Sequence, residues 1–61
     1  MIVLRSHHAK RVRYCSRGIR KLFARYGFDY SDFLKNGIDV EKIKHIDDAM
    51  IKAAIEVAEN E

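Results

Sequence analysis

Arginine and lysine are the residues of this chain whose number and spacing point most directly to a chemical role. Eight of them lie between Arg5 and Arg25, whereas all nine carboxylates lie after residue 28. Residues 1–28 therefore carry a formal charge of +8, and residues 29–61, with four lysines against nine carboxylates, carry −5, which gives the net charge of +3. Six of the eight cations are arginines, whose planar guanidinium suits phosphate oxygens. This segregation favours a polyanionic partner.

Part of this charge is expected on one face of a helix. Apolar residues recur there at spacings of three and four, as Ile19, Leu22, Phe23 and Tyr26. At about 100° per residue, the opposite face carries Arg17, Arg20, Lys21 and Arg25. Clustered cations of this kind neutralise phosphates and release counterions. The predicted binding residues are Lys10, Arg13, Arg17, Arg20, Lys21 and Arg25. The alternative to a binding site is a solvated helix face, whose positive charge is balanced by the negative charge of the acidic half of the same molecule.

A sequence-reading DNA motif is not expected. Residues 40–45 stand where a helix-turn-helix would place its recognition helix, but Asp39 and Glu41 at its start would meet a negatively charged groove. Contacts should therefore go mainly to the nucleic-acid backbone, without strong sequence specificity. Tyrosine rings can also stack on bases. Tyr14 and Tyr30 are candidates, whereas Tyr26 lies on the apolar face and is expected in the core.

Metal chemistry and catalysis are not expected, and neither is a cofactor. His7, His8, His45 and Cys15 are nominal zinc ligands, but the chain has no Cys-x-x-Cys or His-x3-His pair. Adjacent histidines on a helix should diverge, so His7 and His8 are predicted on the surface. Cys15 beside arginines at a helix start has features of a nucleophile, but a lone buried cysteine is commoner. A short chain also offers little room for a substrate cleft.

The elements that position these residues are predicted to form an all-α single domain over residues 1–61, a small bundle of three to four short helices. The chain is 48% hydrophobic and has no proline, and 61 residues allow one small core, centred on the aromatic residues 23–33. The first five residues are expected to form a short extended segment or a frayed end. Ser6 is the predicted cap of a helix through Val12. A break near residues 14–16 precedes a helix that Ser16 caps and Gly27 ends.

One sequence pattern occurs three times in the second half: an apolar residue, an aspartate, any three residues and another apolar residue. This is the spacing of an N-cap with a hydrophobic staple, and it predicts caps at Asp29, Asp39 and Asp47. The helices expected to follow cover residues 30–35, 40–45 and 48–60. Gly37 should end the first of them in a Schellman motif, with Ile38 packing back on Phe33.

Cysteine content and hydropathy indicate where the chain acts. A single cysteine cannot form an intrachain disulfide, which excludes the framework of small secreted domains. The longest apolar run, residues 1–4, is too short to span a membrane, and the sequence shows no positively charged leader followed by a long apolar stretch. A cytoplasmic protein is expected. A homodimer would add buried area that one short chain lacks.

Several segments together resemble a known group of proteins. They are residues 14–20 (YCSRGIR), 23–30 (FARYGFDY), Phe33-Leu34, Gly37-Ile38 and 48–50 (DAM). Across residues 8–55 the chain resembles short uncharacterised proteins encoded by tailed bacteriophages and prophages. Members of that group often have histidine at Tyr26, tryptophan at Tyr30 and glycine at Asp47. The resemblance implies a phage origin, action within the bacterial host cell and a small accessory or assembly role, and it transfers no functional residue.

The sequence therefore predicts a non-enzymatic binding module whose N-terminal basic helix face engages a polyanion, with nucleic acid as the first candidate. The alternative is a protein-interaction or assembly factor in phage morphogenesis or host takeover. In that case the basic face would meet an acidic protein surface, with aromatic residues near positions 26–33 as anchors.

Overall fold

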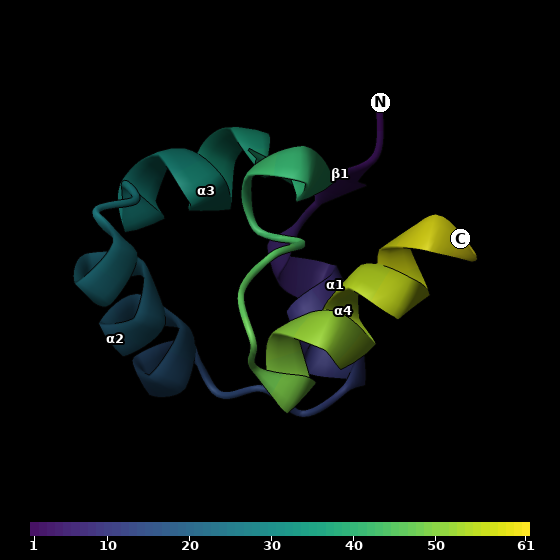
Figure 1. The fold of residues 1–61 in the computed structure, drawn as a ribbon, viewed down its shortest axis with the longest axis horizontal. Helices are drawn as coiled ribbons and strands as arrows, with labels where there is room; N and C mark the ends of the chain where they lie inside the picture. The colour runs from purple at the N-terminus through teal and green to yellow at the C-terminus, as the bar shows by residue number, and fades with distance from the viewer.

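A computed structural model describes all residues, 1–61, as four helices and a small sheet. The elements in chain order are β1 (Val3–Leu4), α1 (Ser6–Arg11), α2 (Ser16–Tyr26), α3 (Tyr30–Asn36), β2 (Ile38–Asp39), the 3-10 turn η1 (Val40–Lys42) and α4 (Ala49–Glu59). The helices α2 and α3 lie on one side, α1 and α4 lie on the other, and residues 43–48 cross between them (Figure 1). The prediction of a small helical domain is confirmed, but the strictly all-α class is wrong.

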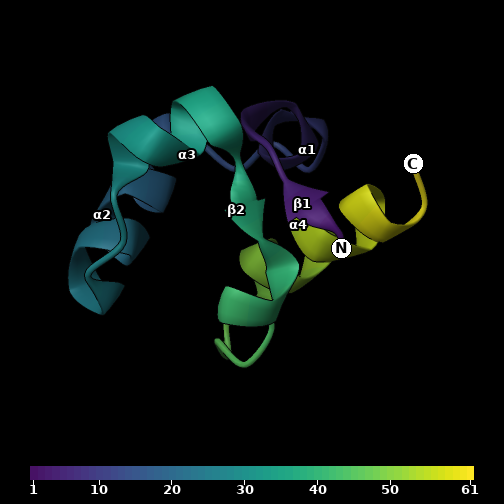
Figure 2. The ribbon, with the colours of Figure 1, turned by 90° about the horizontal axis from the view of Figure 1, so that it is seen from above.

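The sheet is the part of the fold that the sequence did not predict in full. Strands β1 and β2 pair antiparallel, with Val3 opposite Asp39 and Leu4 opposite Ile38 (Figure 2). The backbone N–H of Val40 extends the pairing by donating to the carbonyl of Ile2 at 3.0 Å. Of the two alternatives for the first five residues, the extended segment is the one present, over Val3–Leu4, where β2 supplies its partner.

Gly37 makes this pairing possible. Its φ of 75° and ψ of −175° lie in a region that is essentially restricted to glycine. A Cβ at this position would lie 2.8 Å from the carbonyl oxygen of Leu4, so the absent side chain also lets β1 approach. The Schellman motif expected at Gly37 is wrong, because the extended ψ directs the chain into β2.

The Schellman motif forms one helix earlier, at Gly27. This glycine is left-handed, with φ 76° and ψ 21°, and its N–H donates to the carbonyl of Ala24. The N–H of Phe28 donates to the carbonyl of Phe23 at 2.8 Å, and the two rings meet edge to face at 5.6 Å. Both hydrogen bonds and the apolar contact of the motif are present, so the predicted end of α2 is confirmed.

Aspartates cap the elements of the second half, as two of the three staple patterns predicted. The Asp29 and Asp39 carboxylates accept from backbone N–H groups at the starts of α3 and η1. The third cap is Asp48, and the prediction of Asp47 is wrong. Asp47 forms an ion pair with Lys52 at 2.9 Å, so a charged pair occupies the two staple positions that belong to the Asp48 cap. Ile46 and Ile51, the expected staple, are buried in the core. The predicted helix over residues 40–45 is only the 3-10 turn η1, Val40–Lys42.

The caps of the first half also differ from the prediction by one residue. Cys15, not Ser16, caps α2, because its sulfur accepts from the N–H of Gly18 at 3.4 Å. Arg5, not Ser6, is the N-cap of α1, which ends at Arg11. The expected break between α1 and α2 is confirmed, and Arg13 adopts a left-handed φ of 61° within it.

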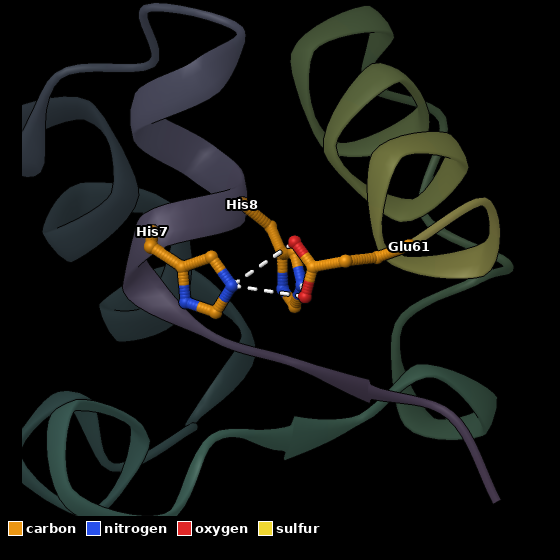
Figure 3. A group of neighbouring side chains, drawn as sticks. All are labelled: His7, His8 and Glu61. Atoms are coloured by element: carbon orange, nitrogen blue, oxygen red, sulfur yellow. Dashed lines mark hydrogen bonds and ion pairs between the residues drawn. The ribbon is translucent and has the colours of Figure 1, made fainter.

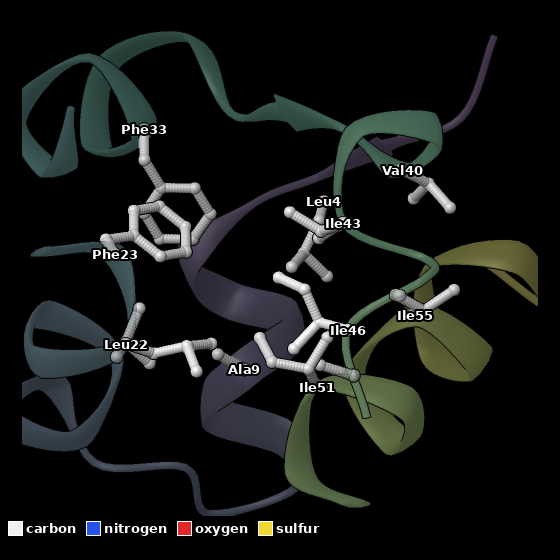
Figure 4. Packing of buried hydrophobic residues seen from close by; sticks show 12 residues of the cluster. Leu4, Ala9, Leu22, Phe23, Phe33, Val40, Ile43, Ile46, Ile51 and Ile55 are labelled. Carbon is white, nitrogen blue, oxygen red and sulfur yellow. The ribbon is translucent and has the colours of Figure 1, made fainter. Parts of the chain in front are cut away.

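The core joins an aromatic part to an aliphatic part. Phe23 is fully buried and meets Phe33 edge to face at 4.9 Å. Figure 4 shows these rings between α2 and α3, and Ile46 beside Ile51 of α4; Ile43 belongs to the same buried cluster. The remaining buried apolar residues are Leu4, Ala9, Ile19, Leu22, Val40, Ala54 and Ile55. The predicted aromatic centre is therefore only half of the core.

Tyr26 does not belong to this core. Its side chain is 44% exposed and stacks on Phe28 with a centroid distance of 6.4 Å. The prediction that packing would bury it is wrong, because the Schellman motif ends α2 at the next residue and no element covers that end of the apolar face.

The two longest helices, α2 and α4, have eleven residues each, and no helix is both long and apolar enough to cross a bilayer.

Candidate nucleic-acid interface

The six predicted binding residues are all exposed. They are Lys10 on α1, Arg13 in the following turn, and Arg17, Arg20, Lys21 and Arg25 on α2. None of them has a carboxylate oxygen within 4.0 Å, so none forms an ion pair. The ion pairs of the molecule use His7, His8, Arg11, Lys44 and Lys52 instead. The cationic surface is therefore free to meet an external anion.

Three of these residues form a stripe along α2. Arg17, Lys21 and Arg25 follow one another at intervals of four residues, which places them one above the other on the helix. Like charges at this spacing destabilise a helix by about 0.2–0.5 kcal/mol per pair. Arg17 also lies in the first turn, which has no acidic residue, where the positive end of the helix dipole disfavours a cation. The stripe is thus unfavourable for the helix that carries it.

Arg20 is directed differently from the stripe. Its guanidinium carbon lies 5.2 Å from the centroid of the Tyr30 ring on α3, which is cation–π geometry. This contact holds the arginine beside α3 while leaving its N–H groups without a carboxylate partner.

The acidic half of the chain does not neutralise this surface. Asp29, Asp39 and Asp48 accept hydrogen bonds as helix caps. Two further carboxylates form ion pairs within this half, Glu41 with Lys44 and Asp47 with Lys52. The hydrogen bond from Lys52 lowers the pKa of Asp47. The carboxylates of the second half therefore form no ion pair with the six residues, and the basic face is exposed to solvent, as the alternative interpretation of a solvated face also expects.

A groove opens beside the cationic residues. It measures about 280 Å³ and lies between α1, the following turn, α2 and α3. Its lining residues are Ser6, Lys10, Tyr14, Ser16, Ile19, Tyr30, Phe33 and Leu34. Of the predicted binding residues, the structure places Lys10 in its wall, and Arg20 covers the Tyr30 ring that forms part of the lining.

Tyr14 is positioned in this groove by a glycine. A Cβ on Gly18 would lie only 2.9 Å from Cε1 of the Tyr14 ring, so the ring packs where a side chain would otherwise stand. Burial raises the pKa of the Tyr14 hydroxyl, and the negative charges of Asp48 and Cys15 add to the increase. The hydroxyl is therefore a neutral donor at physiological pH. Cys15 itself is exposed, so the expectation of a buried cysteine is wrong.

The histidines form a cluster that the sequence did not predict. His7 and His8 do not diverge: the Nε2 atoms of both lie near Oε1 of Glu61, at 3.1 Å and 2.8 Å (Figure 3). His8 is also buried, with 4% of its surface exposed, and not on the surface as expected. These hydrogen bonds lower the pKa of Glu61. No sequence signal links residues 53 positions apart, so this contact was not accessible from spacing.

The protonation of His8 argues against a metal ion in this cluster, although its three side chains offer ligand atoms within 4.8 Å of one another. The backbone N–H of Arg5 donates to Nδ1 of His8 at 2.8 Å, so the proton of the neutral ring is on Nε2 and points to Glu61. A metal on Nε2 would move that proton to Nδ1, against the Arg5 N–H. The Arg11 guanidinium, 3.9 Å from Glu61, adds a competing cation. The cluster instead joins α1 to the segment after α4.

Comparison of the chain with protein-family models, with curated proteins and with solved structures gave no match.

Proposed function

We propose that the chain is a non-enzymatic binding module whose basic face engages a polyanion, with nucleic acid as its partner. The observation that carries the proposal is that six exposed cations gather on α1, α2 and the turn between them without one ion pair. Three of them form two like-charge pairs four residues apart on α2, Arg17 with Lys21 and Lys21 with Arg25, which are unfavourable for the helix and are expected where selection acts on binding. The contacts would go to phosphates, with little sequence specificity.

The absence of catalysis is part of the same proposal. The only thiol, Cys15, is engaged as the cap of α2 and hydrogen-bonds to no histidine. The buried histidine, His8, is fixed by Arg5 and Glu61. No nucleophile and base are therefore paired in the manner that covalent catalysis needs.

The first experiment measures binding of a labelled oligonucleotide of arbitrary sequence by fluorescence anisotropy. We expect affinity to fall more than tenfold between about 50 mM and 200 mM salt. Replacing Arg17, Arg20 and Lys21 with glutamine should abolish binding and leave the helical circular dichroism unchanged. No binding by the wild-type protein at low salt would contradict the proposal.

The matched control replaces three lysines of the acidic half, Lys35, Lys42 and Lys44, with glutamine. It removes the same net charge from surfaces outside the basic face. We expect this variant to keep most of its affinity. If both triple variants lose binding equally, the molecule responds to net charge alone and the basic face is not a site.

A protein-interaction role is the second candidate, favoured by exposed apolar side chains near the predicted anchors. Tyr26 and Leu34 are 44% and 52% exposed. A phage or prophage origin and action in the bacterial cytoplasm, which rest on the resemblance, accompany both candidates as proposals. A pull-down from infected or lysogenic cells tests this role: an acidic protein captured by the wild type and lost in Tyr26→Ala supports it, and recovery of nucleic acid alone contradicts it.

A further inference from the structure

The groove beside the basic face has the features of a site for one unpaired nucleobase. We propose that it binds a base of a single-stranded nucleic acid, with Tyr14 and Tyr30 contacting the base and Lys10 and Arg20 contacting the flanking phosphates. The inference rests on the proposed function and specifies which form of nucleic acid is bound. It is argued from the rings, hydroxyls and charges at the groove.

Charge distinguishes this groove from the other hollows of the surface. Three further hollows are each lined by at least two carboxylates, for example Glu56 and Glu61 in one and Asp29 and Asp32 in another. The groove between α1, α2 and α3 has no acidic residue in its lining, and Lys10 is the one charged residue there. It is therefore the hollow that suits an anion.

Its size and shape suit a single base. A volume of about 280 Å³ is near the lower end of ligand pockets, which measure about 300–1,000 Å³. The Tyr14 and Tyr30 rings are both half-buried and packed against the core. Rings held in this way lose little conformational entropy when a ligand stacks on them, and such stacking accepts any base.

Unpaired hydroxyls line the same groove. The side chains of Ser6, Tyr14, Ser16 and Tyr30 form no hydrogen bond within the protein. Since no buried polar side-chain atom lacks a partner, the hydroxyls of Ser6, Tyr14 and Tyr30 are not fully buried, and Ser16 is an exposed residue. These hydroxyls offer donors and acceptors to the edge of a base, which in a duplex would be paired with the opposite strand.

The cations continue from the groove along α2. Arg20 stacks on Tyr30 at one rim, and Ser16, one turn before it on the same side of α2, lines the groove. From there the stripe of Arg17, Lys21 and Arg25 runs to the end of the helix. A strand with one base in the groove can thus direct its backbone along these cations, whereas stacked and paired bases of a duplex cannot enter.

The test compares three labelled ligands of equal length in the same low-salt buffer by fluorescence anisotropy: a single strand, a duplex, and a single strand in which every base is replaced by an abasic site. We expect the single strand to bind about 5- to 100-fold more tightly than the abasic strand, the range of one stacking contact. Suppose that all three ligands bind with equal affinity and that the variant with Arg17, Arg20 and Lys21 replaced by glutamine still loses binding. That result would overturn the proposal of a base in the groove and leave the proposed function standing. No binding of any ligand would overturn both.

Single substitutions locate the contact. Tyr30→Leu keeps an apolar side chain against Phe23 and should lower single-strand affinity about tenfold. Affinity for the abasic strand should fall much less, because Arg20 loses only the ring that holds it and keeps its charge. Tyr26→Leu is the matched control, because Tyr26 is exposed away from the groove lining, and it should leave both affinities unchanged. Equal losses in the two variants would overturn the assignment.

A second measurement does not depend on the folding of a variant. A single strand carrying 5-iodouracil is irradiated in complex with the wild-type protein, and the crosslinked residue is identified by mass spectrometry. Crosslinks at Tyr14 or Tyr30 are the expected result. Crosslinks only at Tyr26 or other residues outside the groove would contradict the proposal.

Discussion

At the scale of single residues, His8 uses both of its ring nitrogens in hydrogen bonds. Its Nδ1 accepts from the Arg5 backbone and so takes the part that glutamate or glutamine has in a capping box, while its Nε2–H donates to Glu61. His8 lies three residues after Arg5, but the sequence favoured Ser6 as the cap, so the first contact was not predicted. The second contact depends on how α4 folds back on α1, and no local pattern contains that information.

The pH dependence of stability tests this contact. The hydrogen bonds from His7 and His8 lower the pKa of Glu61 below its ordinary value of 4.5, and Arg11 is the other charged group facing it. A lowered folded-state pKa gives stability that is present above the unfolded-state pKa and is lost as the pH falls through the folded-state pKa. Glu61→Gln should therefore destabilise the protein above about pH 4.5, and the difference from wild type should shrink at lower pH.

Urea denaturation of both proteins across this pH range is the measurement. Asp47, whose pKa is lowered in the same direction by Lys52, is present in both proteins, so its contribution cancels. A difference that stays constant down to the lowest pH would show that Glu61 does not act through its charge.

At the scale of elements, most helices could be predicted because their ends are set by local chemistry. Gly27 ends α2 and Asp29 begins α3 through contacts within a few residues. The cap of α4 was misplaced by one residue, because Asp47 and Asp48 are both suitable caps and only the completed helix selects between them. Strands of two residues could not be predicted, since β1 and β2 each exist only through the other.

Alanine substitutions at Gly37 and Gly27 test how much the approach of β1 to Gly37 contributes to stability. Gly37→Ala should destabilise the protein by about 2–4 kcal/mol, because it adds backbone strain and brings a Cβ against the Leu4 carbonyl. Gly27→Ala should cost only about 1–2 kcal/mol, since a Cβ there meets nothing within 4 Å and only the left-handed φ is unfavourable. Chemical denaturation of both variants measures the difference. Equal losses would mean that the approach of β1 to Gly37 contributes nothing.

At the scale of the whole molecule, charge segregation has two different causes. Carboxylates of the second half serve as caps or form ion pairs within that half, and Glu61 pairs with α1, whereas the cations of α2 have no such partner. The exposure of the four cations on α2 could be foreseen, because their helical spacing opposes the apolar face. The groove could not be foreseen, since its walls come from three helices whose arrangement is fixed by the core.

Removing the stripe should therefore relieve repulsion. We expect the Arg17, Lys21 and Arg25 to glutamine variant to be as stable as wild type or more stable, by up to about 1 kcal/mol at low salt. The gain should vanish at about 1 M salt, where charges are screened within about 3 Å. Thermal unfolding at both salt concentrations is the measurement. A loss of stability would show that these cations serve the fold.

The Tyr14 ring occupies the space next to Gly18 that a side chain would fill. Helix stability and the position of this ring therefore favour different residues at position 18. Alanine is the better helix former by up to about 1 kcal/mol, but its methyl group would displace the ring. Libraries of this chain screened only for heat resistance should accumulate alanine at position 18 together with a smaller side chain at position 14, because alanine alone would displace a ring that packs on the core. Libraries screened for capture of single strands should retain glycine, so the residue recovered there reports which property the screen rewarded.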